Sequence, residues 1–281
     1  MLINGEPSEH IAATDRGLHY GDGLFETIAV RDGRLLLWQR HWRRLVEGCA
    51  RLGLPVPDEG EMLAEARAVS AGQARAVVKL ILTRGSGDRG YRPPKIIQGN
   101  RVVLSAPWPI YPSANPTEGV VVRVCNMRLG RNARLAGIKH LNRLEQVLAR
   151  AEWDDPQVAD GLLLDDTDHV IEATGANVFF VHGTLLVTPS VSQCGVRGVV
   201  RDAILEWAPR LGLTVKVGPV TLADVWKADE VFLTNSVIGV WPVRRIECGQ
   251  VAYAKNSTTI ARTVAAGLET CYAQEAGNDS T

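Results

Sequence analysis

One lysine of this sequence stands where a side-chain amine could do covalent chemistry. Lys139 lies just after Gly137, and the apolar spacing of the residues that follow predicts a helix directly after it. A lysine at such a boundary can form a Schiff base with a carbonyl compound if its surroundings disfavour the ammonium form. Lowering a lysine pKa from about 10.4 to about 7 or 8 costs roughly 3 to 5 kcal/mol, so burial or nearby cations are required. His140 and Arg143 are candidates for such cations.

The same spacing supports a simpler interpretation. The predicted helix has an apolar stripe made of Leu141, Leu144, Val147 and Leu148. Lys139 would project away from the centre of that stripe, where ordinary solvated lysines lie. Periodicity alone therefore favours a lysine that faces water, and a catalytic role needs further support.

A resemblance supplies that support. Residues 135–148, which contain the run Gly-Ile-Lys-His-Leu-Asn-Arg-Leu-Glu-Gln, resemble the lysine segment of the aminodeoxychorismate lyase family. These enzymes use pyridoxal 5'-phosphate (PLP) and belong to the fold type IV group, with the D-amino acid and branched-chain aminotransferases. The resemblance implies an α+β protein with a smaller N-terminal α/β domain, a larger C-terminal domain with a mixed, barrel-like sheet, and the cofactor between them.

PLP requires a lysine for its aldehyde, an acid for its pyridine nitrogen, a phosphate cradle and a wall against its ring. The resemblance implies Lys139 for the aldehyde. It implies Glu172 for the nitrogen, because Glu172 opens a Glu-x-x-x-x-Asn-x-Phe segment. Taken alone, Glu172 would more simply be a strand-end carboxylate that faces water. Phe25, in a Gly-Asp-Gly-x-Phe-Glu segment, is implied for the wall, although turn and core structure would also explain that segment.

A phosphate site is expected where Gly198 opens a predicted helix. The first backbone N–H groups of that helix, at Val199 and Val200, have no intrahelical partner and can bind an anion. Helix starts are common, so this signal is weak by itself. The resemblance adds Arg44, in a His-x-x-Arg-Leu segment, and the hydroxyl of Ser236 to the same phosphate cradle.

Residues 85–90 fit the pattern G-x-G-x-x-G, but a dinucleotide site is not expected there. That site needs a helix after the glycines, whereas Pro93 and Pro94 follow closely. We instead predict a loop that presents basic and aromatic side chains to an anion; a plain basic surface loop is the alternative. The predicted anion-facing residues are Arg84, Arg89, Tyr91 and Arg92. The resemblance implies that Arg89 and Tyr91 reach the substrate carboxylate in the neighbouring subunit, so that the active site requires a homodimer.

The composition excludes several classes of protein. A chain of 281 residues with 46% hydrophobic residues can bury a core, and its 31 basic and 31 acidic side chains cancel. A nucleic-acid partner is therefore not expected, and an anionic small molecule must meet local arginines. Five scattered cysteines suggest a reducing cytoplasm, and we expect neither a secretion signal nor a membrane span nor a metal site.

The order of predicted elements is that of an α+β protein, because regular βαβ alternation is absent. Proline-rich residues 109–116 are interpreted as a linker between an N-terminal domain, 1–108, and a C-terminal PLP-binding domain, 117–281. The last residues, 277–281, are expected to fray. Helices are predicted at 38–52, 199–211 and 258–272. Strands are predicted at 24–30, 34–38, 76–83, 101–106, 120–125, 161–164, 170–172, 177–181, 185–187 and 230–234.

The resemblance implies a reaction as well as a cofactor. The substrate would be 4-amino-4-deoxychorismate, and Lys139 would act as the general base for the C4 proton. The products would be pyruvate and 4-aminobenzoate, for folate biosynthesis. A D-amino acid or branched-chain aminotransferase is the alternative; residues 140–146 and Gly239, where aminotransferases usually carry Glu, favour the lyase. A protein that merely binds PLP is disfavoured, because Lys139, Glu172 and Arg44 are all present.

Overall fold

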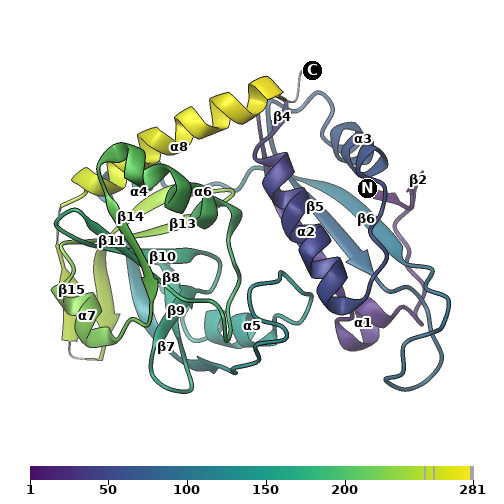
Figure 1. Cartoon of the computed structure of the whole chain (residues 1–281), viewed down its shortest axis with the longest axis horizontal. Helices are drawn as coiled ribbons and strands as arrows, with labels where there is room; N and C mark the ends of the chain where they lie inside the picture. The colour runs from purple at the N-terminus through teal and green to yellow at the C-terminus, as the bar shows by residue number, and fades with distance from the viewer. Residues whose placement is uncertain (250, 256, 279–281) are drawn as a thin grey trace. The chain divides into compact units, whose positions relative to one another are not determined.

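The computed structural model describes residues 1–249, 251–255 and 257–278, and it divides into two compact units. The first unit comprises Met1–Pro109 and the short segment Ile138–Asn142, and the second comprises Ile110–Gly137 and Arg143–Thr281. The main division thus falls at the start of the proline-rich stretch. Each unit combines its own sheet with helices, and the α+β class predicted from the sequence is confirmed (Figure 1).

The first unit is built on a six-stranded antiparallel sheet with the order β2-β1-β6-β5-β3-β4. The predicted hairpin is confirmed, because Asp32 and Gly33 join β3 to β4 with φ of 51° and 73°. The second predicted strand is shorter than expected, since α2 already begins at Trp38. The strands of this sheet are β1 (Leu2–Ile3), β2 (Glu6–Pro7), β3 (Gly23–Arg31), β4 (Arg34–Leu35), β5 (Arg75–Thr83) and β6 (Asn100–Pro107).

Helix α2 (Trp38–Leu52) packs on β3 and lies across this sheet (Figure 1). Its apolar spacing puts Trp38, Leu45 and Cys49 in the core, and Gly53 ends the helix with φ of 63°. Two further helices, α1 (Arg16–Tyr20) and α3 (Glu59–Val69), were not predicted from the sequence.

The second unit is built on a nine-stranded mixed sheet with the order β12-β11-β10-β13-β14-β7-β8-β9, and β15 pairs with β14. Strand β9, at one end of this order, also packs against β10 and β11, so the sheet curls on itself as the barrel-like prediction requires. Its strands are β7 (Val120–Leu129), β8 (Val158–Asp165), β9 (Val170–Ala173), β10 (Asn177–His182), β11 (Leu185–Pro189), β12 (Thr214–Gly218), β13 (Glu230–Asn235), β14 (Gly239–Cys248) and β15 (Val251–Ala254).

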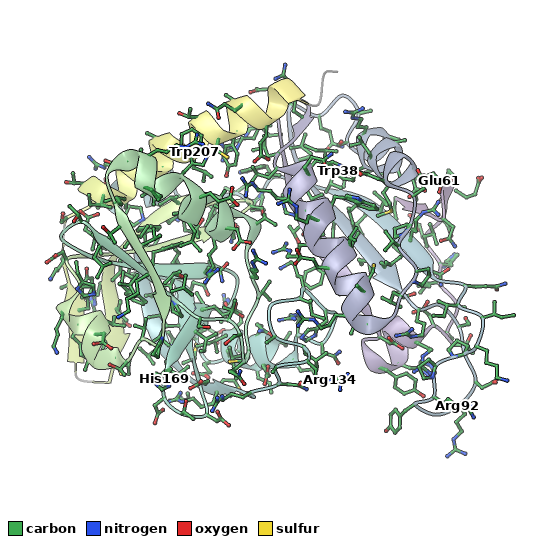
Figure 2. All side chains as sticks on the ribbon, viewed as in Figure 1. Trp38, Glu61, Arg92, Arg134, His169 and Trp207 are labelled. Atoms are coloured by element: carbon green, nitrogen blue, oxygen red, sulfur yellow. The ribbon has the colours of Figure 1, made fainter. Side chains whose placement is uncertain are left out.

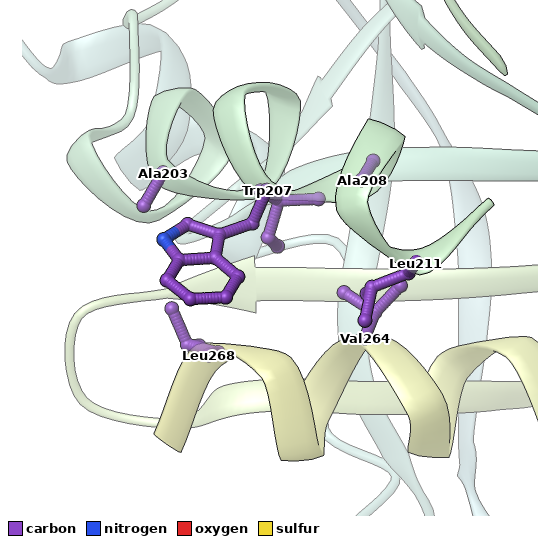
Figure 3. Close-up of a pocket in the computed structure, with 7 residues that line it drawn as sticks. Ala203, Trp207, Ala208, Leu211, Val264 and Leu268 are labelled. Atoms are coloured by element: carbon purple, nitrogen blue, oxygen red, sulfur yellow. The ribbon is translucent and has the colours of Figure 1, made fainter. Parts of the chain in front are cut away.

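The helices of the second unit pack against this sheet and against one another. Helix α6 and the short 3-10 helix η1 (Ala208–Leu211) pack against α8, with a small apolar pocket between them (Figure 3). Gly267 of α8 permits this approach, because a Cβ there would lie 3.1 Å from Leu211 Cδ1. The other helices are α4 (Asn115–Glu118), α5 (Leu144–Arg150), α6 (Val199–Trp207), α7 (Leu222–Lys227) and α8 (Thr259–Asn278).

The prediction for the helix after Lys139 was partly wrong. Helix α5 begins only at Leu144, and three residues of the predicted apolar stripe do not enter the core: Leu144 is 75%, Val147 60% and Leu148 59% exposed. Of the end predicted to fray, residues 277 and 278 belong to α8, and 279–281 lie outside the described residues. Within the part of the chain that the structure describes, no helix is long and apolar enough to cross a membrane.

Candidate active site

Lys139 lies in an extended segment alongside the first half of β3. The N–H of Phe25 donates to the Lys139 carbonyl at 2.9 Å, and the N–H of Leu141 donates to the Gly23 carbonyl at 3.0 Å. The lysine is therefore held by sheet hydrogen bonds and does not stand at a helix start as predicted. Since successive side chains of an extended segment point to opposite sides, Lys139 and His140 project in opposite directions.

Phe25 supplies an aromatic face next to the lysine. The Lys139 Nζ lies 4.4 Å from the centroid of the Phe25 ring, and the Lys79 Nζ lies 5.2 Å from it. The ring is half-buried on the face of β3 opposite the core side chains Leu24 and Ile28. The structure thus brings together two residues that the sequence assigned to the cofactor.

Arg44 projects from α2 onto a buried carboxylate, Glu26 of β3. Its Nε donates to Glu26 Oε1 at 2.8 Å and its Nη2 to Glu26 Oε2 at 2.5 Å, while His41 Nδ1 lies 2.6 Å from Oε2. The Glu26 side chain is 1% exposed and that of Arg44 10%. A guanidinium carries five N–H donors, so this pairing fixes the direction in which Arg44 presents the rest.

Both titratable partners in this group have shifted pKa values. Burial alone would raise the pKa of Glu26, but the charge of Arg44 and the hydrogen bonds from His41 and Arg44 outweigh it and lower the pKa to about 2. Burial lowers the pKa of His41, and the charges of Arg44 and Lys139 lower it further against the effect of Glu26. Glu26 is therefore ionised and His41 is shifted towards its neutral form.

Glu172 is placed in the second unit, near the middle of β9. It is 4% exposed, and its Oε2 accepts a hydrogen bond from the N–H of Val196 at 2.8 Å. The simpler expectation of a water-facing carboxylate is therefore wrong. A buried, oriented carboxylate of this kind is suited to a cationic ring N–H.

Helix α6 begins at Val199, as predicted from Gly198. Val199 and Val200 are buried, and no side chain among residues 1–249, 251–255 and 257–278 caps the helix start. Arg201, also in the first turn, is buried and donates to the Pro189 carbonyl at 3.0 Å. Uncapped amides at a helix N-terminus suit a phosphate, because the helix dipole and the N–H groups both favour an anion.

Ser236 lies in the turn between β13 and β14. The Oδ1 of Asn235 shapes this turn by accepting from the N–H groups of Val237 at 2.8 Å and Ile238 at 2.9 Å. The Nδ2 of Asn235 donates to the Gly175 carbonyl at 2.9 Å, which ties the turn to the segment after Glu172. The turn that holds Ser236 is thus joined to the strand pair that holds Glu172.

The predicted anion-binding loop follows β5 and does not enter a helix, as expected. Arg89, Tyr91 and Arg92 are exposed, Tyr91 at 85%, and the Arg92 side chain projects outward (Figure 2). Arg16 anchors the loop by donating to the carbonyls of Gly90 at 3.0 Å and Tyr91 at 3.1 Å.

For Arg84, the prediction of an anion-facing side chain is wrong. It is 5% exposed, pairs with Asp22 at 2.7 Å, and donates to the carbonyls of Leu52 at 2.8 Å and Gly53 at 3.0 Å. Its guanidinium fastens the end of α2 to β5, so it is not presented to an anion in the loop.

The structure therefore groups the predicted residues within each unit. Lys139, Phe25 and Arg44 lie in the first unit, with Arg89 and Tyr91 on its loop. Glu172, Val199, Val200 and Ser236 lie in the second. The first unit carries an amine, an aromatic face and a guanidinium, and the second carries a buried acid and anion donors; PLP requires groups of these kinds.

Sequence reasoning assigned no role to Glu26 and His41, although a signal was present. Glu26 interrupts the buried face of β3 between Leu24 and Ile28, and an acid on such a face requires a partner. His41 and Arg44 are three residues apart on α2 and so share a helix face.

The chain is similar to known proteins over most of its length. The family model for amino-transferase class IV matches residues 23–246. The chain is 40% identical to the aminodeoxychorismate lyase of Vibrio harveyi over 245 residues, which are 87% of this chain and 90% of that protein. The crystal structure of the 4-amino-4-deoxychorismate lyase from Pseudomonas aeruginosa matches with a TM-score of 0.89 and 42% identity, covering 96% of this chain and 98% of that one.

A more distant structure shares the fold alone. A hypothetical aminotransferase from Mycobacterium tuberculosis, solved in its PLP-bound form, matches with a TM-score of 0.81 at 20% identity over 95% of each chain. The fold is therefore that of the fold type IV enzymes, as the sequence predicted. From the family model, which spans most of the chain, and from the 40% identity to a curated relative, we conclude that this protein belongs to the amino-transferase class IV family.

Proposed function

We propose that this protein is a PLP-dependent lyase that converts 4-amino-4-deoxychorismate into 4-aminobenzoate and pyruvate. The observation that carries this proposal is the similarity to two lyases of that name, at 40% and 42% identity over nearly the whole chain. The lyase-like segment around Lys139 and the donor set described above support it independently.

Each cofactor residue has a role that follows from its surroundings. Lys139 attaches PLP, and the Phe25 ring beside its amine packs against the cofactor. Glu172 accepts a hydrogen bond from the pyridine N–H. The amides of Val199 and Val200, the Ser236 hydroxyl and the Arg44 guanidinium bind the phosphate, and Glu26 holds Arg44 in place for this.

When bound, PLP would supply an electron sink for a bond that breaks at the amine-bearing carbon of the substrate. Lys139 removes the proton from C4 of the substrate as the general base. The enolpyruvyl group then leaves from the adjacent carbon and becomes pyruvate. The ring that remains is aromatic, and this aromatisation drives the step forward.

The backbone at Gly239 favours a lyase over an aminotransferase. Gly239 has φ of 65°, in the left-handed region, and its carbonyl accepts from the Thr234 hydroxyl at 2.7 Å. The Glu that aminotransferases usually carry at this point would be strained in that conformation. The turn after Ser236 therefore differs from the one we expect in an aminotransferase.

The exposed features of the chain support a homodimer. Arg89 and Tyr91 protrude from the first unit, where they suit the carboxylate of a substrate bound to a second copy. The apolar stripe of α5, formed by Leu144, Val147 and Leu148, is exposed in the single chain. Such a surface is commonly covered in an oligomer.

We place the reaction in the cytoplasm and in folate biosynthesis. Among the described residues, no two of the five cysteines form a disulfide, and four of the five are buried, which suits a reducing compartment. The thiols of Cys49, Cys125 and Cys194 are not suited to exchange, since burial raises the pKa of Cys49 to about 11 and those of Cys125 and Cys194 to about 12.

The cofactor is tested first. The purified protein should absorb visible light from bound PLP, and borohydride should fix the cofactor on the peptide that contains Lys139. A protein that takes up no PLP, or fixes it on another lysine, contradicts the proposal.

A further inference from the structure

One short segment of the second unit connects three of the elements assigned to the cofactor. This segment, residues 195–198, runs from Gly195 to the glycine that precedes α6. It is bonded to Gly137, just before Lys139 in the chain, to Glu172 of β9 and to Asn177 of β10. Asn177 is not among the residues assigned to the cofactor.

Two successive peptide groups of this segment are held on both sides. In the first, the Gly195 carbonyl accepts from Gly137 N–H at 2.9 Å, and the Val196 N–H donates to Glu172 Oε2 at 2.8 Å. In the second, the Val196 carbonyl accepts from Asn177 Nδ2 at 2.9 Å, and the Arg197 N–H donates to the Gly137 carbonyl at 2.9 Å. Neither peptide can rotate without breaking hydrogen bonds on both of its sides.

Asn177 also packs closely against the start of α6. It is 6% exposed, and a Cβ built on Gly198 would lie 1.9 Å from its Oδ1. Only glycine therefore fits at the residue before the helix while Asn177 keeps its position. The amide thus fixes the segment in two ways, by a hydrogen bond to Val196 and by contact at Gly198.

We propose that Asn177 is a positioning residue that holds the 195–198 segment in one conformation. The Glu172 carboxylate, the first amides of α6 and Gly137, two residues before Lys139, then keep fixed positions relative to one another. The inference rests on the proposed function, because it takes Glu172 and α6 as contacts of PLP. Its physical basis is preorganisation: groups already held in the binding geometry lose less entropy when the cofactor binds.

Asn177→Asp is the sharpest variant because it keeps the shape and one oxygen of the side chain. It replaces the N–H donor to the Val196 carbonyl with an acceptor, so the second peptide loses its lock. Thr188→Val is the matched control: the buried Thr188 hydroxyl also donates to a carbonyl of β10, that of Val178 at 2.8 Å, and not to residues 195–198.

Two properties of the holoenzymes should be measured besides activity. These are the rate at which PLP is lost to a scavenging apoenzyme and the pH titration of the bound-cofactor absorbance. We expect Asn177→Asp to release PLP about 10- to 100-fold faster, as the loss of a buried hydrogen-bond partner implies, and to shift the titration midpoint. Thr188→Val should match the wild type in both, even if both variants melt at lower temperature.

Wild-type behaviour of Asn177→Asp in both measurements would overturn the inference, and so would an equal change in Thr188→Val. If Asn177→Asp does not fold, Gly198→Ala tests the same contact from the other side and should release PLP faster. Wild-type retention of PLP by Gly198→Ala would then overturn the inference. A wild-type protein that binds no PLP contradicts the proposed function itself, which keeps the two failures distinguishable.

Discussion

At the scale of single residues, Lys139 owes its position to the sheet and not to a helix. Its carbonyl is bonded to β3, and its amine lies over Phe25, so the side chain starts from a rigid backbone. Lys79 places a second amine over the same ring from β5. The two lysines therefore offer a matched comparison.

Lys139→Ala should reduce turnover by at least roughly a thousandfold, because both the proposed cofactor anchor and the proposed general base are lost. Lys79→Ala should retain most of the activity and the covalently fixable PLP. Both are measured by 4-aminobenzoate formation and by borohydride labelling. Near-normal turnover in Lys139→Ala would count against the assignment.

Glu26 should dominate the acid sensitivity of the first unit. Its pKa is about 2 in the folded protein against an ordinary value of 4.5, so its ionised form stabilises the fold above about pH 4.5 and this contribution is lost as pH falls towards 2. Glu26→Gln should lower the free energy of unfolding by about 3 to 5 kcal/mol at pH 7, since it leaves Arg44 without its buried partner.

The difference between wild type and Glu26→Gln should shrink as pH falls from about 4.5 to about 2, as measured by urea unfolding. Glu61→Gln is the control, because Glu61 is an exposed acid paired with Arg101 at 3.2 Å (Figure 2). It should cost about 1 kcal/mol or less. A pH-independent difference for Glu26→Gln would contradict the assigned pKa.

At the scale of elements, the segment after β5 contains two arginines with different surroundings. Arg84 is buried against Asp22 and the end of α2, whereas Arg89 is exposed on the loop. Arg84→Ala should destabilise the protein by about 3 to 5 kcal/mol. Arg89→Ala should leave stability within about 0.5 kcal/mol of wild type.

Arg89→Ala should instead raise KM by about 10- to 100-fold with a smaller change in kcat, because it removes the proposed charge-assisted contact to the substrate carboxylate. Arg34→Ala, an exposed arginine of β4, is the control and should leave KM unchanged. An unchanged KM in Arg89→Ala would show that the loop does not bind substrate.

Elements with a strong local pattern could be predicted from the sequence. Asp32 and Gly33 both tolerate positive φ, so the β3–β4 hairpin was predictable, and the spacing from Trp38 to Gly53 defined α2. The start of α5 could not be predicted, because the apolar residues after Lys139 fit the spacing of a helix. Hydrogen bonds to β3, which is distant in sequence, instead hold Lys139 and Leu141 extended. Long-range hydrogen bonds of this kind leave no local pattern.

Site residues that belong to a recognisable motif could be predicted from the sequence. Residues that act by holding another residue in place could not. Lys139, Glu172 and Arg44 could be assigned roles from the resemblance. The support that Glu26 gives to Arg44, and that Asn177 gives to Val196, depends on pairing between strands and helices, so only the structure reveals it.

In the whole molecule, residues of each unit are assigned to the cofactor, and the loop of Arg89 and Tyr91 is assigned to the substrate of a second copy. This arrangement predicts complementation. In a mixed dimer of Lys139→Ala and Arg89→Ala subunits, one of the two sites would have both an intact lysine and an intact partner loop.

Refolding the two inactive or weakened variants together should therefore restore about a quarter of wild-type activity at low substrate, as random pairing in a twofold dimer implies. Light scattering should show dimers, and Leu148→Glu on the exposed face of α5 should weaken them. Mixtures no more active than the mean of the separate variants would show that each site uses residues of one chain only.

A single assay distinguishes the proposed lyase reaction from amino transfer. The purified holoenzyme is incubated with 4-amino-4-deoxychorismate and no added keto acid, and 4-aminobenzoate and pyruvate are followed together. We predict that the two products form in equal amounts and that both are lost in Lys139→Ala. Amino transfer that requires a keto acid, with no aromatic product, would contradict the lyase assignment.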